Sequence, residues 1–101
     1  MKTLLDTTTE IYVYEKPVDM RKSYDGLFSL VRKRGIFKGG IFVFLSKDRK
    51  RSKSIFWDGS GLTILMKRME HGRFIDITRR GSITHEELVD FYLGSAIIKK
   101  V

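Results

Sequence analysis

Five consecutive apolar residues, Ile41–Leu45, follow the glycine pair Gly39-Gly40 and constrain the fold of this chain more than any other segment. Ile, Val and Phe favour extended structure. A strand that is apolar at every position has no face suited to water, so it needs cover on both sides. The chain of 101 residues is long enough for one core and one domain. We therefore expect Ile41–Leu45 to be a central, covered strand in a single globular domain, 1–101.

Further strands are predicted around this one. Segments with alternating or β-favouring residues are Glu10–Tyr14, Ser54–Trp57, Leu62–Met69 and Phe74–Thr78. A polar loop, Ser46–Ser52, follows the central strand, and the glycine-containing turn Asp58–Gly61 leads into Leu62–Met69. For that last segment a helix is the alternative, because its apolar residues also recur at helical spacing.

Two helices are expected from their start and stop signals. Asp19 can cap a helix that ends at Gly35, with the apolar face Met20, Tyr24, Leu27, Phe28 and Val31. The series Thr84-His85-Glu86-Glu87 has the form of a capping box and starts a shorter helix, with apolar face Leu88, Phe91 and Tyr92, that ends at Gly94. Residues 1–9 are predicted as a flexible arm and residues 95–101 as a C-terminal tail. The predicted fold class is α+β, a mostly antiparallel sheet of four to five strands with one long and one short helix.

Composition excludes several classes of protein. The absence of cysteine excludes a disulfide scaffold and thiolate zinc sites. No apolar run reaches about eighteen residues, the length of a membrane-spanning helix, and the first residues lack the apolar core of a signal peptide. We expect a cytoplasmic protein with no membrane contact.

The charge of the chain points to a polyanionic partner. Twenty Lys and Arg against twelve Asp and Glu leave a net charge of +8, and nucleic acid is the first partner to consider for so basic a domain. The densest group of cations is Lys47, Arg49, Lys50, Arg51 and Lys53, with Asp48 as its one acid. On a hairpin tip such side chains can reach successive phosphates. The alternative is an ordinary solvated turn.

A second basic group lies downstream and consists of Lys67, Arg68, Arg73, Arg79 and Arg80. Residues 47–80 hold ten Lys and Arg against four acids, so +6 of the total charge falls in this window. Such concentration favours a binding face. Trp57 could stack on a base, although core packing is the alternative. Arg21 and Lys22 could present cations at a helix start, unless Asp19 merely caps that helix and pairs with Arg21.

Catalysis is not expected from this sequence. The candidate acids show no nuclease spacing: Asp19, Asp25, Asp58, Asp76, Glu86 and Glu87. Asp58 suits a turn and Glu87 a capping box. No nucleophile triad, HExxH or phosphate-binding loop is present. We therefore expect no catalytic residues, no metal site and no cofactor.

Four motifs together resemble one known family. They are Tyr14–Lys22 (YEKPVDMRK), Ile55–Leu62 (IFWDGSGL), Lys67–Glu70 (KRME) and Gly72–Phe74 (GRF). In this combination they resemble the TnpB-type accessory protein of the insertion-sequence-66 family of transposable elements, over residues 10–94. The resemblance implies a helper of transposition, encoded beside a separate and larger transposase. It gives weight to Arg21, Lys22, Arg68 and Arg73, which lie inside the motifs, whereas residues 75–78 depart from the family pattern.

Two hypotheses follow. In the first, a basic sheet and loop face binds nucleic acid, DNA rather than RNA, without strong sequence preference, through Arg21, Lys22, Lys47, Arg49, Lys50, Arg51, Lys53, Trp57, Lys67, Arg68 and Arg73. In the second, the chain is a protein-interaction module that docks on the transposase without touching DNA. A homodimer through an exposed sheet edge is compatible with either hypothesis.

Overall fold

The computed structural model describes residues 10–35, 39–93 and 98–99, those from Asp90 onward by their backbone alone. Its elements run in the order β1 (Ile11–Val13), α1 (Tyr24–Val31), the 3-10 turn η1 (Arg32–Arg34), β2 (Ile41–Leu45), β3 (Arg51–Trp57), β4 (Leu62–Arg68), β5 (Arg73–Phe74), β6 (Ser82–Ile83), α2 (His85–Leu93) and β7 (Ile98–Lys99). The expected α+β class is confirmed.

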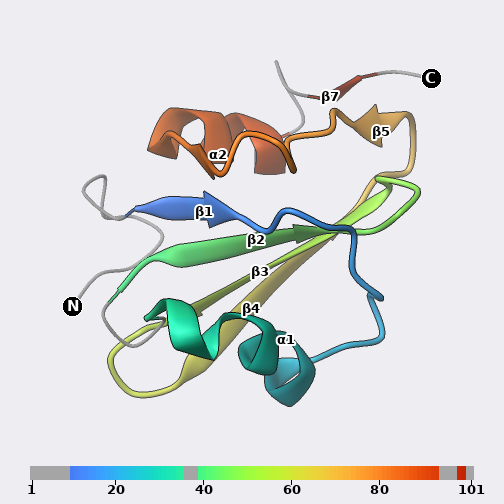
Figure 1. Cartoon of the computed structure of the whole chain (residues 1–101). Coiled ribbons are helices and arrows are strands. Elements are labelled where there is room, and N and C mark those ends of the chain that lie inside the picture. Colours follow the sequence, from blue (N-terminus) through green and yellow to red (C-terminus); the bar gives the residue numbers. More distant parts are fainter. Residues whose placement is uncertain (1–9, 36–38, 94–97, 100–101) are drawn as a thin grey trace.

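A five-stranded sheet in the order β4-β3-β2-β1-β6 forms the centre of the molecule. The pairs β1–β6, β2–β3 and β3–β4 are antiparallel. Strands β1 and β2 run parallel and are joined by the α1 crossover, because parallel neighbours cannot be linked by a tight turn. Helix α1 lies on one side of the sheet, and α2 with the small β5–β7 pair lies on the other (Figure 1).

Strand β2 is the covered central strand that the sequence predicts, and all five of its residues are buried. Its side chains alternate between two apolar clusters. Ile41, Val43 and Leu45 belong to the cluster on the α2 side. Phe42 and Phe44 belong to the cluster on the α1 side, with Leu27, Val31 and Ile55. The double cover explains why this strand carries no polar residue.

The first helix begins later than predicted. Asp19 does not cap it. Instead Asp19 Oδ1 accepts from the backbone N–H of Arg21 at 2.9 Å, and the carboxylate also binds the Arg21 guanidinium. Two residues of the expected helix, Met20 and Arg21, therefore lie in a local turn, and α1 starts at Tyr24. The predicted end is confirmed, since Gly35 follows η1 with φ 82°, a left-handed conformation that glycine adopts without strain.

Strand boundaries also differ from the prediction. Strand β3 starts at Arg51, within the expected loop, because Ser52 and Ser54 are small enough to be fully buried on one face of the strand. Strand β4 is confirmed as a strand, and the helical alternative is wrong, since all seven of its residues pair with β3. The predicted strand Phe74–Thr78 shrinks to Arg73–Phe74, because Asp76 folds the next residues by accepting from Thr78 N–H at 3.0 Å. Strand β6, two residues long, carried no signal of its own.

The capping box of α2 is confirmed in both directions. Glu87 N–H donates to Thr84 Oγ1 at 3.1 Å, and Thr84 N–H donates to Glu87 Oε1 at 3.0 Å. The expected helix end Gly94, the arm 1–9 and most of the tail 95–101 lie outside the described residues. So do the side chains of Phe91 and Tyr92.

Candidate nucleic-acid interface

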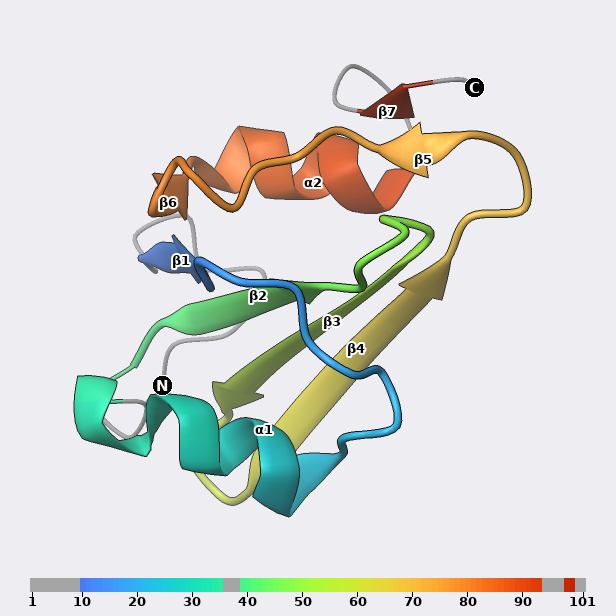
Figure 2. The ribbon, with the colours of Figure 1, turned by 45° about the vertical axis from the view of Figure 1, so that its right-hand side comes forward.

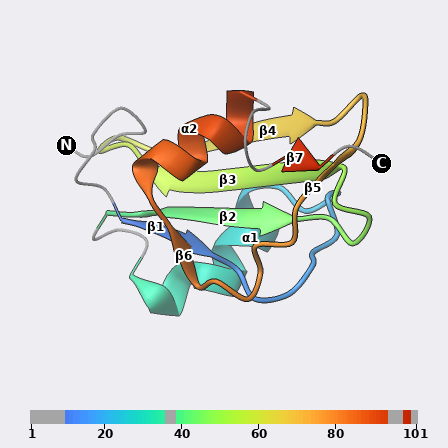
Figure 3. The ribbon, with the colours of Figure 1, turned by 90° about the horizontal axis from the view of Figure 1, so that it is seen from above.

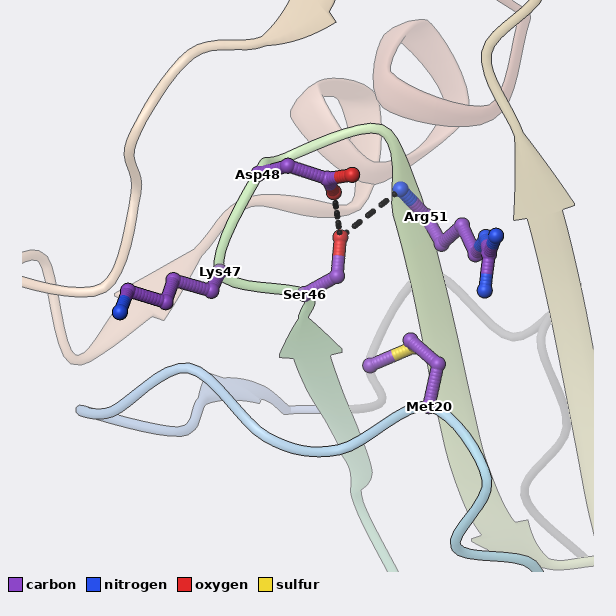
Figure 4. A pocket seen from close by; sticks show the side chains of 5 residues that line it. All are labelled: Met20, Ser46, Lys47, Asp48 and Arg51. Atoms are coloured by element: carbon purple, nitrogen blue, oxygen red, sulfur yellow. Dashed lines mark hydrogen bonds between the residues drawn. The ribbon is translucent and has the colours of Figure 1, made fainter.

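The turn between β2 and β3 is organised by Ser46 and Asp48. Ser46 N–H donates to the Arg51 carbonyl at 3.0 Å, and Arg51 N–H donates to Ser46 Oγ at 3.1 Å. The Ser46 hydroxyl in turn donates to Asp48 Oδ1 at 2.7 Å, and Lys50 N–H donates to the same oxygen at 3.0 Å. Figure 4 shows the two bonds of the Ser46 hydroxyl. These bonds to the ionised carboxylate lower the pKa of Asp48, the Ser46 hydroxyl contributing most.

The same turn is clamped from outside by the chain that follows β4. Met69 N–H donates to the Lys50 carbonyl at 2.6 Å, and Phe74 N–H donates to the Arg49 carbonyl at 2.8 Å. Arg49 has φ 59°, the left-handed region that a side chain with a Cβ rarely adopts. Such a conformation persists only where the surroundings impose it. The turn is therefore a fixed platform, and Arg68 of the second basic group lies opposite Arg51 beside it.

Three cations project from this platform into water. Lys47, Lys50 and Arg51 are exposed, whereas Arg49 is half-buried. The pKa of Asp76 is lowered mainly by the Thr78 hydroxyl and N–H, with a smaller contribution from the charge of Arg49. Within the described residues, none of these four side chains forms an ion pair with a carboxylate. The one acid of the group, Asp48, is already occupied by the turn.

A shallow hollow of about 470 Å³ opens beside the turn, lined by Met20, Ser46, Lys47, Asp48 and Arg51. In Figure 4 the Lys47 and Arg51 side chains extend from opposite sides of it, and Met20 reaches it from the loop before α1. The hollow thus has an apolar floor with a cation on each flank. Arg21 and Lys22 directly follow Met20 in the chain, so their backbone continues from the edge of the hollow at which Met20 lies.

Arg68, on the neighbouring strand β4, lies next to the cations of the β2–β3 turn. In the β3–β4 register Arg51 lies opposite Arg68, so two guanidinium groups stand on one face of the sheet. Like charges in directly opposite positions destabilise a sheet. Arg68 pairs with Glu70 at 2.9 Å, and both side chains are exposed. We name Lys47, Lys50, Arg51 and Arg68 the turn surface.

The structure separates other predicted site residues from the turn surface. Lys53 is only 9% exposed, and its Nζ donates to the Lys22 carbonyl at 2.7 Å, so it ties β3 to the loop before α1. Trp57 is half-buried at the far end of β3. Lys67 alternates with Arg68 and therefore faces the α2 side.

Two further arginines are less available for phosphate contact than the sequence suggests. Arg73 is half-buried in β5, and its Nε is buried without a hydrogen-bond partner among the described residues. Arg21 is 91% exposed but forms a bidentate pair with Asp19, the pairing that the sequence offered as the alternative to phosphate contact. Met20 and Ser46 were not among the site residues predicted from the sequence. The Ser46-x-Asp48 spacing, which suits a side-chain-bonded turn, was the available signal for Ser46.

Four of the six acids considered for catalysis form local structural bonds: Asp19, Asp58, Asp76 and Glu87. Asp58 Oδ1 accepts from the backbone N–H groups of Ser60 and Gly61, both at 2.9 Å, and Oδ2 accepts from the Thr63 hydroxyl at 2.8 Å. These bonds lower the pKa of Asp58 to about 2. Glu87, bonded mainly to Arg80, has its pKa lowered to about 2 as well. No cluster of three or more His, Asp or Glu able to hold a metal ion occurs within the described ranges.

No helix in the described part of the chain is long and apolar enough to cross a membrane. Fold and surface together define a small α+β structure with a fixed, exposed basic turn at one end of its sheet.

Comparison with known proteins identifies the family. The family model described as IS66 Orf2 like protein matches residues 9–99, and the chain belongs to this family. Membership implies an accessory role associated with transposition. One relative is the uncharacterized protein y4jC of Sinorhizobium fredii (strain NBRC 101917 / NGR234), 41% identical over 68 residues. The match covers 64% of this chain and 58% of the relative, less than two thirds of its length. No solved structure matches the chain.

Proposed function

We propose that this chain is a non-catalytic accessory protein of DNA transposition that binds nucleic acid, DNA in preference to RNA, through the turn surface. One observation carries the proposal. The β2–β3 turn is fixed by its own hydrogen bonds and by two from the segment after β4, while Lys47, Lys50 and Arg51 form no close ion pair with a carboxylate among the described residues. A pre-ordered turn with exposed cations suits phosphates, because little backbone freedom is lost on binding.

The expected mode of binding is phosphate contact with little base readout. The four side chains of the turn surface are all cations, and roughly half to two-thirds of protein–DNA hydrogen bonds go to phosphate and sugar. Arg51 and Arg68 can in addition bond guanine edges, so the comparison of terminal-repeat and scrambled duplexes measures how much sequence is read. Each neutralised phosphate releases counterions, so the affinity falls steeply with salt.

The test is fluorescence-anisotropy titration of duplex DNA carrying the element's terminal repeat, across a salt series. A scrambled duplex, a single strand and an RNA duplex serve as comparisons. The triple variant Lys47→Ala/Lys50→Ala/Arg51→Ala should weaken duplex binding and reduce the slope of log K against log salt by about 2 to 3.

The matched control removes three cations elsewhere, as Lys16→Ala/Arg32→Ala/Lys33→Ala. These exposed residues lie outside the turn surface, two of them in η1 before β2, and the variant has the same net charge as the first. Equal loss in both triple variants would assign binding to net charge alone. Unchanged affinity in the turn variant would remove the proposed surface.

Docking on the transposase is the second candidate, and Tyr24 favours it. This aromatic side chain at the start of α1 is 49% exposed, and exposed aromatic residues are enriched at protein interfaces. If the isolated chain ignores DNA but co-purifies with the transposase, and Tyr24→Ala abolishes that association, the chain is a protein-interaction module.

A further inference from the structure

The outer edge of β4 is the longest open strand edge in the described structure. Strand β4 ends the sheet order, and no described segment pairs with its second side. Figure 3 shows it along one border of the sheet. The opposite border is β6, only two residues long. An open edge presents unpaired N–H and C=O groups to any strand that can align with it.

We propose that this edge pairs with β4 of a second copy of the chain, antiparallel and centred on Leu65. A two-fold interface requires one strand to be complementary to itself in reverse. Leu65 is the middle residue of the seven in Leu62–Arg68, so this register pairs the whole strand. It places Ile64 opposite Met66 of the second copy.

Apolar exposure supports the chosen register. Met66 is 56% exposed, although it stands next to Ile64 on the α1 side of the sheet. Pairing with Ile64 of the second copy removes part of that apolar surface from water, at both symmetric positions. The open edge and the exposed methionine are thus accounted for by one contact.

Charge complementarity supports it as well. In the same register Lys67 lies opposite Thr63 of the second copy, and the Thr63 hydroxyl donates to Asp58 Oδ2 at 2.8 Å. Asp58 is fully ionised near neutral pH, since its hydrogen bonds lower its pKa to about 2. The cationic end of each strand therefore meets the acidic turn of the other. Shifting the centre of the register to Lys67 instead would bring like charges face to face, which destabilises a sheet.

Single-cysteine cross-linking reads this register directly, because the natural chain has no cysteine. Directly opposite residues of an antiparallel pair have Cβ atoms about 4.5–5.5 Å apart, and diagonal neighbours about 7–8 Å. Under mild oxidation Leu65→Cys should form a disulfide-linked dimer fastest. Ile64→Cys and Met66→Cys should each cross-link slowly alone and quickly when the two variants are mixed.

Sedimentation equilibrium on nucleic-acid-free protein gives the second readout. The unmodified chain should approach twice the chain mass as concentration rises. Lys67→Glu should return it to the chain mass, whereas the charge-matched control Arg79→Glu, on an exposed residue outside the sheet, should not. Circular dichroism confirms that both variants are folded.

A chain that stays monomeric up to its solubility limit overturns the proposal. So does a dimer in which the cysteine variants at 64–66 cross-link no faster than Lys33→Cys, in η1. Neither measurement contains DNA, so failure here leaves the proposed nucleic-acid binding untouched.

Discussion

At the scale of single residues, Arg49 stores backbone strain inside the β2–β3 turn. Its φ of 59° is the one positive value at a described residue other than glycine. A left-handed conformation costs a residue with a Cβ about 1–2 kcal/mol. We predict that Arg49→Gly is more stable than Arg49→Ala by about 1 kcal/mol, although both variants lack the same side chain. Urea unfolding measures the difference.

Lys50 supplies the control, because it lies in the same turn without a positive φ. There the order should reverse, with Lys50→Gly less stable than Lys50→Ala, since glycine loses more freedom on folding. If Arg49→Gly and Arg49→Ala were equally stable, the strain inferred for the turn would be absent.

Asp58 ties the stability of the β3–β4 turn to pH. Its pKa is about 2 in the folded chain and 3.8 without these contacts. Because the folded value is the lower one, its contribution is complete above pH 4 and is lost as the pH falls from about 4 to about 2. Asp58→Asn cannot titrate, so its disadvantage against the unmodified chain should shrink over that window.

The measurement is urea unfolding of both chains at pH 7, 4 and 2.5. Other acids titrate in both chains, so the difference between them isolates position 58. A gap that stays constant with pH would mean that the charge of Asp58 does not stabilise the turn.

At the scale of elements, α2 depends on its capping box. Thr84 and Glu87 bond each other's backbone N–H groups. Thr84→Ala should therefore lower the free energy of unfolding by about 1 kcal/mol. Thr84→Ser keeps the hydroxyl and should stay close to the unmodified value in the same denaturation experiment. Equal losses in both variants would assign the effect to the threonine methyl group rather than to the cap.

The helices and strands also show which features of the sequence were sufficient to predict the fold. Strand β2 and the α2 cap were predictable, because a strand that is apolar at every position and a capping box can both be recognised from local sequence alone. The start of α1 was not predictable, because Asp19 could either cap the helix or bond Arg21. Arg21 offers both a backbone N–H and a guanidinium to the carboxylate. The burial of Lys53 could not be predicted for a related reason. Lys53 sits among cations in the sequence, but strand alternation and the Lys22 carbonyl draw it into the interior.

At the scale of the whole molecule, the two proposals fit together geometrically. In both Figure 1 and Figure 2 the β2–β3 turn lies at the end of the sheet where β4 finishes. Antiparallel pairing about Leu65 would place Arg68 of one copy opposite Leu62 of the other. The Arg68 residues of the two copies would then be six positions apart along the paired strands. At about 3.3 Å per residue, the two turn surfaces would stand about 20 Å apart along the strand direction. A two-fold axis perpendicular to the sheet puts both on the α1 side.

This arrangement predicts that dimers bind a duplex with both turn surfaces at once. The Leu65→Cys chain tests it without any change in charge, since its oxidised and reduced forms differ only in the cross-link. On a duplex of about two helical turns, the oxidised dimer should bind more tightly than the reduced chain at equal turn-surface concentration. Its slope of log K against log salt should be about twice as steep, because twice as many phosphates are neutralised. On a duplex too short to reach both surfaces the advantage should vanish, and an advantage that persisted there would mean that the cross-link improves a single binding surface rather than joining two.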